Sequence, residues 1–167
     1  TIKLECWDIF THKKYIMGQD EIDRKILRQL QRDCDVSLDT LGLEVGLSRN
    51  ACWRRIKQMQ EAGLIRKRVA LLEAQKLNLG LTVYIQVRAE KHTAAWSEAF
   101  ARATRAIPEI TGVFRMSGDL DYLIRAHVAD MKGYDRLYQK MIAEVSMADV
   151  SASFVMESIK DTTELPL

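Results

Sequence analysis

The order in which two hydrophobic periods alternate in the second half of the sequence is the feature that most restricts its fold. Four segments alternate polar and apolar residues as half-buried strands do, namely residues 82–89, 112–117, 121–128 and 150–159. Between the first two, apolar residues recur at helical spacing until Pro108, and between the last two they recur after Asp130, a suitable N-cap. The order strand-helix-strand-strand-helix-strand predicts an α+β, ferredoxin-like sheet with both helices on one face.

The opposite face of this sheet is predicted to be mixed in polarity. Successive side chains of a strand point to opposite faces, so Tyr122 and Ile124 are expected to face the helices while Leu123 and His127 do not. Tyr84 falls on the same outer face in the first strand. A second subunit would bury the apolar residues of this face and still pair its polar ones, which predicts at least a homodimer.

Residues 19–66 show three helical patterns separated by capping residues. Asp20 is placed to cap the first helix, Ser37 the second and Ser48 the third. Gly46 lies where a left-handed residue allows a sharp turn, and Gly63 ends the last pattern. Three short helices with such a turn predict a helix-turn-helix domain, and residues 67–78 are predicted to form a linker strand.

Positive charge is concentrated on the third helix and on the residues after it. The whole chain carries a formal net charge of +2. Between Leu47 and Arg68, seven Lys or Arg residues stand against one Glu. Such a cluster indicates a nucleic-acid surface, and the alternative is a solvated cationic face without a ligand.

The outward face of the third helix carries residue types that bind DNA. With Cys52 and Ile56 turned inward, a rotation of about 100° per residue leaves the basic residues outside. Arg and Asn near the helix start suit base edges, and later basic residues suit phosphates. Trp53 would pack as readily as it would contact DNA, and Arg55 would alternatively pair within the domain. The predicted DNA-binding residues are Ser48, Arg49, Asn50, Trp53, Arg54, Arg55 and Lys57, with further backbone contacts from Arg66, Lys67 and Arg68.

The stretch MSGDLDYLIR, residues 116–125, places Asp119 and Asp121 at the start of an apolar run. Residues two apart on an extended chain point the same way, but no nucleophile or phosphate-binding loop accompanies them, which argues against catalysis. A metal ion would need more ligands, and His127 lies about 20 Å further along the strand at ~3.3 Å per residue. From spacing alone the carboxylates are ordinary turn residues, and neither a metal nor a cofactor is predicted.

Composition favours a soluble, cytoplasmic protein. No apolar run approaches the roughly 20 residues that cross a bilayer, and the first 17 residues lack the apolar core of a signal peptide. Cys6, Cys34 and Cys52 are odd in number and widely spaced, which fits free thiols. Residues 1–18 show little periodicity and are assigned to an N-terminal arm, in which Met17 would itself serve as a natural start.

Ordered motifs across residues 20–167 resemble the Lrp/AsnC, or feast/famine, family of transcriptional regulators. In the first half these are DRKIL from Asp23, VGLS from Val45, CWRRIK from Cys52 and EAGLI from Glu61. In the second half they are IPE from Ile107, SGDLDYL from Ser117, VADM from Val128, SFVME from Ser153 and TTELP from Thr162. The resemblance implies a (winged) helix-turn-helix DNA-binding domain joined to an amino-acid-sensing ferredoxin-like domain, residues 79–167. It also implies dimers that usually assemble into octamers.

By that resemblance, the loop 116–122 lines an effector site between dimers. Gly118 and its neighbours would offer backbone N–H groups to an amino acid's carboxylate, and Asp119 or Asp121 would accept its ammonium. The predicted effector-binding residues are Met116, Ser117, Gly118, Asp119, Asp121, Tyr122 and, as weaker candidates, Ser151 and Ser153. The segments CWRR, VALL and TTELP are most similar to the branch that senses cysteine, so a sulfur amino acid is the first expectation.

The start of the third helix departs from the family. Many members carry prolines where this chain has Arg49, Asn50 and Ala51, so a base preference does not carry over. The expected function is a sequence-specific DNA-binding regulator that is not an enzyme and whose effector and operator affinities depend on each other. An architectural DNA-binding protein without an effector, and an enzyme of ferredoxin-like fold, are the alternatives.

Overall fold

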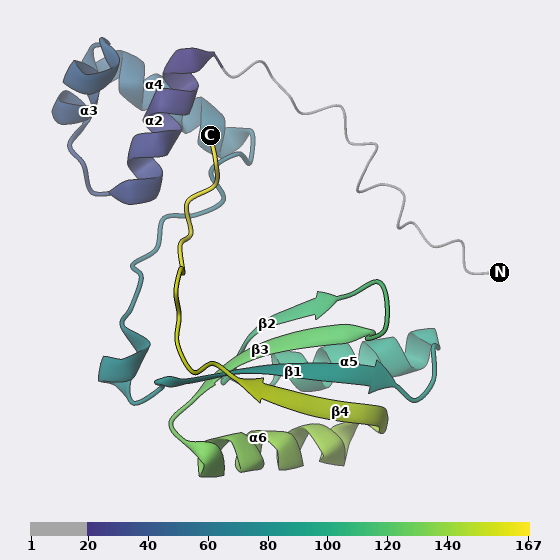
Figure 1. Ribbon diagram of the computed structural model, residues 1–167. Coiled ribbons are helices and arrows are strands. Elements are labelled where there is room, and N and C mark those ends of the chain that lie inside the picture. Colours follow the sequence, from purple (N-terminus) through teal and green to yellow (C-terminus); the bar gives the residue numbers. More distant parts are fainter. Residues whose placement is uncertain (1–19) are drawn as a thin grey trace. The chain divides into compact units, whose positions relative to one another are not determined.

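The structure, a computed structural model, describes residues 20–167, so the arm predicted at residues 1–18 lies outside the described residues. The described chain divides into two compact units (Figure 1). We call residues 20–70 together with Asp161–Leu167 the helical unit, and Leu71–Lys160 the sheet unit. This division differs from the predicted boundaries because the last seven residues belong with the helices rather than with the sheet.

Three helices, α2 (Glu21–Arg32), α3 (Leu38–Val45) and α4 (Arg49–Glu61), form the helical unit. The predicted N-caps are confirmed, since the side chains of Asp20, Ser37 and Ser48 each accept a hydrogen bond from the backbone N–H three residues on. The apolar stripes of the helices meet in one core. Its buried members are Ile26, Leu27, Leu41, Cys52, Ile56 and Met59.

The turn between α3 and α4 depends on two glycines. Gly46 has a φ of 71°, in the left-handed region that glycine tolerates best. The N–H of Leu47 then donates to the Gly42 carbonyl at 2.9 Å, and a Cβ on Gly42 would lie only 2.5 Å from the Leu47 carbonyl oxygen. The close approach of these backbones fixes where α4 begins.

The linker between α4 and the first strand of the sheet is not a strand, which corrects the prediction for residues 67–78. Residues 62–73 form neither helix nor strand, and a 3₁₀ helix, η2 (Ala74–Leu77), follows them. A strand needs a hydrogen-bonded neighbour, and this segment has none within residues 20–167. Val69, Leu71 and Leu72 are 59%, 72% and 74% exposed, so the apolar pattern that suggested a strand is not buried in a single chain.

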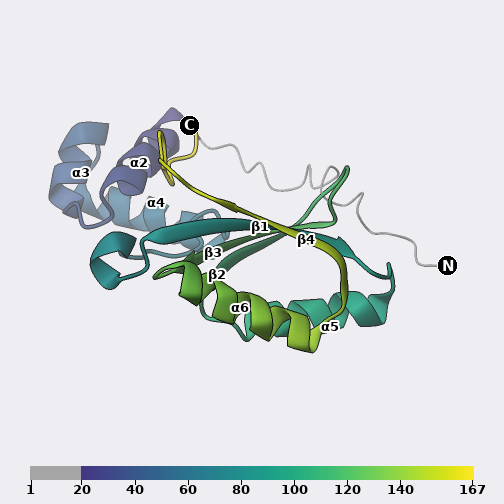
Figure 2. The same ribbon diagram turned by 60° about the horizontal axis from the view of Figure 1, so that its bottom comes forward.

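The sheet unit has the predicted ferredoxin-like order. Its elements are β1 (Leu81–Ala89), α5 (Ala94–Arg105), β2 (Ile110–Arg115), β3 (Tyr122–Val128), α6 (Met131–Glu144) and β4 (Met147–Phe154). The strands pair antiparallel in the order β2-β3-β1-β4, and both helices cover one face (Figure 2). The last strand was predicted at 150–159, but its pairing with β1 ends where Phe154 meets Val83.

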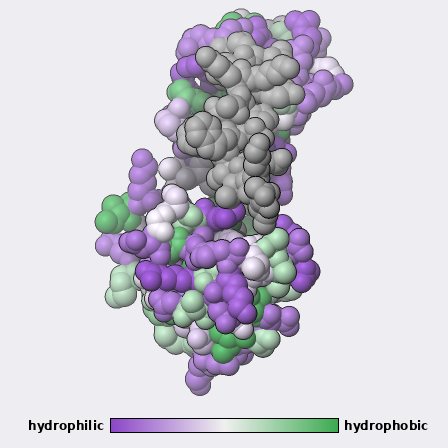
Figure 3. Space-filling model, turned by 90° about the vertical axis from the view of Figure 1, so that its right-hand side faces the viewer, coloured by the Kyte–Doolittle hydropathy of each residue, from purple (hydrophilic) through white to green (hydrophobic). Residues whose placement is uncertain are grey.

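The two faces of the sheet divide as the alternation predicted. Val83, Ile85 and Ile124 are fully buried against the helices, and Tyr122 packs beside them. The register pairs Gln86 with Leu123 on the other face, which the helices do not cover. In the view of Figure 3, hydrophilic side chains predominate and hydrophobic ones are scattered among them, as on ordinary protein surfaces. Across residues 20–167, no helix is long and apolar enough to span a membrane.

Candidate nucleic-acid interface and ligand site

One face of α4 is exposed and cationic. The side chains of Arg49, Asn50, Trp53, Arg54 and Lys57 are exposed on it. Ser48 is exposed as well, but its hydroxyl is used by the helix, since it accepts a hydrogen bond from the Ala51 N–H at 3.3 Å. The free backbone N–H groups of a helix start favour a phosphate nearby. The exposed face therefore combines groups suited to bases with groups suited to phosphates.

Arg55 lies outside this face and pairs within the helical unit, as the alternative for this residue foresaw. Its Nη1 lies 2.8 Å from Asp20 Oδ2 and 2.8 Å from Asp23 Oδ1. The carboxylates raise the pKa of the Arg55 guanidinium, Asp23 most strongly. The Asp23 N–H and, after it, Arg55 hold the pKa of Asp20 below its usual value. Arg55 thus ties α4 to the start of α2, and it is a poor candidate for a phosphate contact.

The other basic side chains of the face differ in how free they are. Arg49 Nη1 pairs with Asp39 Oδ2 of α3 at 3.0 Å, and Lys57 Nζ lies 5.2 Å from the centre of the Trp53 ring. Within residues 20–167, Arg54 makes no side-chain hydrogen bond or ion pair. Arg54 can therefore turn to a phosphate without first breaking a contact in the protein.

The Trp53 side chain is partly exposed to solvent and partly packed against its own unit. It is 54% exposed. Together with Lys57 and Arg68 it also lines a groove of about 410 Å³ whose floor is apolar. Cys52, on the opposite side of α4, is fully buried, and burial raises the pKa of its thiol. A protonated thiol in the core packs as a small apolar group.

The loop 116–122 in the sheet unit separates its predicted ligand residues into two groups. Met116, Ser117, Gly118 and Asp119 are exposed, and Gly118 has a φ of 107°. The loop is closed by the Met116 N–H, which donates to the Asp121 carbonyl at 2.9 Å. The exposed group leaves backbone N–H groups and one carboxylate open to solvent, which is what a zwitterion requires.

Asp121 and Tyr122 are engaged by the fold itself. Asp121 Oδ2 accepts a hydrogen bond from the Ala89 N–H at 2.9 Å, and Oδ1 lies 3.7 Å from His92 Nδ1. The Tyr122 ring packs against the rings of Trp96 and Phe100, with centroids 5.8 and 4.5 Å away. These two residues shape the loop by fixing it to the end of β1 and to α5.

Ser151 and Ser153 lie on β4, on the face that the helices do not cover. The register places Ser151 opposite Gln86 and Ser153 opposite Tyr84, and both serines are exposed. Asp149 stands opposite Arg88 one step nearer to Ala89, where the Asp121 side chain is bound. The end of β1 therefore has loop 116–122 beside it through β3 and the start of β4 on its other side.

Sequence reasoning missed the partners that hold Asp121. Ala89 is the last residue of β1 and His92 follows this strand, so both are far from the loop in sequence. The predicted topology contained the signal, because antiparallel pairing brings the end of β1 to the start of β3. Across residues 20–167, no group of three or more His, Cys, Asp or Glu side chains is placed to hold a metal ion.

A helix-turn-helix unit with an exposed cationic helix, joined to a ferredoxin-like unit with an open polar loop, defines a DNA-binding protein with a candidate small-molecule domain. Family models agree in both halves. Residues 19–66 match a winged helix-turn-helix DNA-binding model, although no strand forms a wing after α4 within the described residues. Residues 82–165 match the Lrp/AsnC ligand binding domain.

Relatives and solved structures match along nearly the same length. The DNA-binding transcriptional activator DecR of Escherichia coli (strain K12) is 42% identical over 89% of this chain and 98% of its own. The glutamate uptake regulatory protein of Zymomonas mobilis is 43% identical over 89% of this chain and 90% of its own. The crystal structure of an AsnC family transcriptional regulator from Agrobacterium tumefaciens superposes with a TM-score of 0.85 at 48% identity, covering 88% of this chain and 96% of that one.

A second solved structure carries a ligand in its description. It is a transcriptional regulator of Neisseria meningitidis in complex with L-Met, with a TM-score of 0.84, 35% identity and coverage of 88% of this chain and 96% of that one. The chain belongs to the Lrp/AsnC family of DNA-binding transcriptional regulators.

Proposed function

We propose that this regulator works in the cytoplasm as an oligomer built from homodimers, in which a second subunit covers the sheet face that α5 and α6 leave open. It binds DNA through the exposed face of α4, and its DNA affinity changes when an amino acid binds at loop 116–119. Octamers are the assembly that the family resemblance suggests. No reaction is assigned to it, because the relatives that it matches are named as transcriptional regulators. Reciprocal linkage then makes effector and DNA affinities depend on each other.

The observation that carries the DNA-binding part is the position of Arg54 on the exposed face of α4, free of protein partners among the described residues. We expect Arg54→Ala to weaken DNA binding and to lower the slope of log affinity against log salt by about 1, as loss of one phosphate contact does. Arg102→Ala on α5 removes the same charge from an exposed position in the sheet unit and is the matched control. Equal salt slopes for Arg54→Ala and the control would show that Arg54 contacts no phosphate.

Asp119 is the better candidate for the effector's ammonium, and Asp121 is a positioning residue. Asp119 is exposed, whereas both oxygens of Asp121 already face the Ala89 N–H or His92. We expect Asp119→Asn to lower the effector affinity without changing the thermal midpoint of unfolding. We expect Asp121→Asn to lower both the effector affinity and the thermal midpoint. Calorimetric titration combined with thermal unfolding measures the two effects. If the effector affinity is unchanged in Asp119→Asn, Asp119 does not bind the effector's ammonium, and that role falls to Asp121 or to neither aspartate.

The proposed effector is a sulfur amino acid, cysteine or methionine. Support comes from the segments that are most similar to the cysteine-sensing branch, and from the Neisseria meningitidis relative whose structure is described with L-Met. The relative named for glutamate uptake makes glutamate the main competitor. Titration of the twenty amino acids, with DNA affinity measured alongside, tests the proposal. Absence of heat with every amino acid, and of any change in DNA affinity, would favour an architectural DNA-binding protein.

A further inference from the structure

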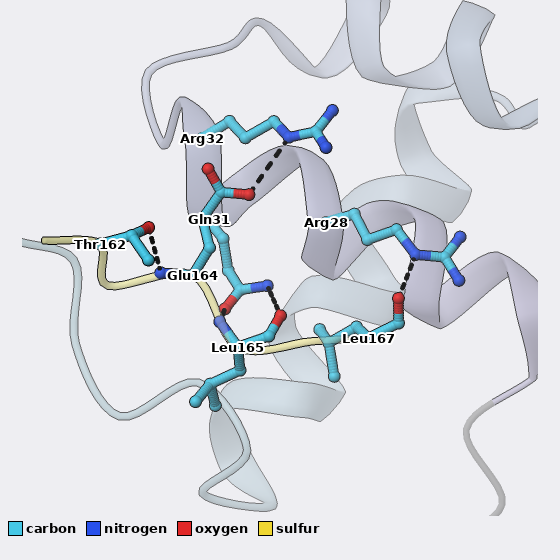
Figure 4. A network of polar contacts seen from close by, with 7 residues as sticks. All are labelled: Arg28, Gln31, Arg32, Thr162, Glu164, Leu165 and Leu167. Atoms are coloured by element: carbon cyan, nitrogen blue, oxygen red, sulfur yellow. Dashed lines mark hydrogen bonds and ion pairs between the residues drawn. The ribbon is translucent and has the colours of Figure 1, made fainter. Parts of the chain in front are cut away.

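The last seven residues of the sequence, Asp161–Leu167, lie along α2 in the helical unit (Figure 4). We call them the tail segment. The Gln31 side chain binds both backbone groups of Leu165: Oε1 accepts from its N–H at 2.6 Å, and Nε2 donates to its carbonyl at 3.2 Å. A primary amide can satisfy one residue in this way, as a neighbouring strand would. Gln31 therefore recognises extended backbone rather than a particular side chain.

Two arginines of α2 hold the tail segment on either side of this pair. Arg32 Nε lies 3.3 Å from Glu164 Oε2, and Arg28 Nε donates to the Leu167 carbonyl at 2.7 Å. Arg28 and Arg32 are separated from each other by four positions and have Gln31 between them. Residues at this spacing share one face of a helix, so the three side chains form one continuous surface.

The tail segment is shaped to fit this surface. Pro166 restricts the residue before it to extended backbone, which is the conformation in which Leu165 presents both polar groups to Gln31. The Thr162 hydroxyl accepts from the Glu164 N–H at 3.1 Å and sets the turn before it. The segment carries two acidic residues and no basic one, whereas α2 carries four basic residues against two acidic ones. Charge and backbone shape are thus complementary.

The tail segment gives the helical unit a second covalent connection to the sheet unit. The first connection runs through residues 71–80 into β1, and the second runs from β4 through residues 155–160. Both leave the sheet at the same end of two paired strands, because Val83 stands opposite Phe154 and the Val155 N–H donates to the Thr82 carbonyl at 3.0 Å. Ser151 and Ser153, predicted ligand residues, lie on the strand that continues into the second connection.

We propose that the surface formed by Arg28, Gln31 and Arg32 is the docking site of the tail segment, and that docking regulates DNA binding by restricting the helical unit. This inference rests on the proposed function. Two connections leave the helical unit fewer orientations than one, so less entropy is lost when the two helical units of a dimer settle on two half-sites. The docking contacts are exposed, and each such contact contributes little, so docked and released segments exchange readily.

Gln31→Met, which removes both hydrogen bonds at similar volume, tests docking in the full chain, with Gln29→Met on the same helix as the matched control. We expect the NMR order parameter of the Leu165 amide to fall from about 0.85 to below about 0.6 in Gln31→Met and to stay unchanged in the control. An equally ordered Leu165 amide in Gln31→Met would overturn the docking site.

DNA fragments with one half-site, or with two half-sites at varied spacing, test the regulation. We expect Gln31→Met to bind the best-spaced pair about tenfold more weakly than the parent, with a flatter dependence on spacing, and to bind a single half-site equally well. The same spacing dependence in both proteins would refute the regulatory role while leaving DNA binding intact. A parent that binds no DNA would instead refute the proposed function, and the order parameters would still report on docking.

Discussion

The helical unit and the sheet unit fix their elements by different means. In the sheet unit, β1 pairs with a strand on each side, and Val83, Ile85 and Val87 of this strand are fully buried. In the helical unit, α4 is positioned by a smaller core, by the ion pairs of Arg55 and by the close backbone approach at Gly42. Packing dominates in the sheet unit, whereas in the helical unit polar and backbone contacts add to a smaller core in positioning α4, the proposed DNA-binding helix.

This difference suits the two proposed roles. Packed interiors resist small displacements, since a core loses contacts as soon as side chains separate. Ion pairs that stay partly exposed, as those of Arg55 do, contribute little energy and rearrange at small cost. A helix held partly by such pairs can adjust to DNA, while the sheet keeps the loop 116–122 in place.

The largest expected effect is on the packed unit. Ile85→Ala removes a side chain with no exposed surface from the central strand, and we expect it to lower the free energy of unfolding of the sheet unit by about 2–5 kcal/mol. Ile159→Ala makes the same change at a position that is 93% exposed, so it is the control. Hydrogen exchange locates the loss. Faster exchange in α4 as well as in the sheet would show that the two units unfold together, and it would contradict the view that each unit is stabilised separately.

Much of this architecture could be predicted from the sequence because its determinants are local. Ser37 and Ser48 cap helices through bonds that span three residues, and alternation in β1 and β3 assigns each side chain to a face. The linker and the end of β4 could not be predicted in this way. Val69 and Ile159 belong to apolar patterns, but strand formation requires a neighbour, and pairing is a property of the whole chain.

The candidate sites were predictable as segments but not as individual contacts. The inward face of α4 identified its outward face, yet Arg55 turned out to pair with Asp20 and Asp23 from another helix. Asp119 and Asp121 look equivalent in sequence, and the contacts of Asp121 with the Ala89 N–H and with His92 distinguish them in the structure. The binding of the tail segment by Gln31 joins residues that are 134 positions apart, and no local signal marks it.

The turn of the helical unit should respond to a single added methyl group. In Gly42→Ala the new Cβ would lie 2.5 Å from the Leu47 carbonyl oxygen, so α3 and α4 must move apart, and we expect a loss of about 1–3 kcal/mol in stability. DNA affinity should fall with it, because the displacement is at the start of α4. In Gly80→Ala the nearest atom is 3.4 Å away on the flexible Gln75 side chain, which makes it the control. Unchanged unfolding and DNA binding in Gly42→Ala would mean that backbone approach does not position α4.

Loss of the Arg55 ion pairs should have a smaller effect on the same helix. Arg55→Ala removes both contacts to the start of α2, and we expect the thermal midpoint of the helical unit to fall by a few degrees, because partly exposed pairs are weak. Arg54→Ala, one position earlier on α4, leaves the midpoint unchanged and lowers DNA affinity instead. If both variants lowered DNA affinity equally with no change in the midpoint, Arg55 would be a phosphate contact and not a tie between helices.

The smallest expected effect is at acid pH, where each unit contains one carboxyl group with a lowered pKa. Asp20 in the helical unit is held down by the Asp23 N–H and by Arg55, and Glu109 in the sheet unit by its own N–H and by Lys140. A depressed pKa stabilises the folded state above the unfolded value, 3.8 for Asp20 and 4.5 for Glu109, and this stabilisation is lost as pH falls through the folded value. We therefore expect Asp20→Asn to flatten the loss of stability below about pH 4 in the helical unit, and Glu109→Gln to flatten it in the sheet unit. Urea unfolding between neutral and acid pH, followed by hydrogen exchange in each unit, measures the pH dependence of stability in both variants.

Asp20 pairs with Arg55, which helps to position α4, whereas Glu109 pairs with Lys140 in the sheet unit. Only Asp20→Asn should therefore also alter DNA affinity at neutral pH. An equal change of DNA affinity in Glu109→Gln would show that the two units are more strongly coupled than their separate cores imply.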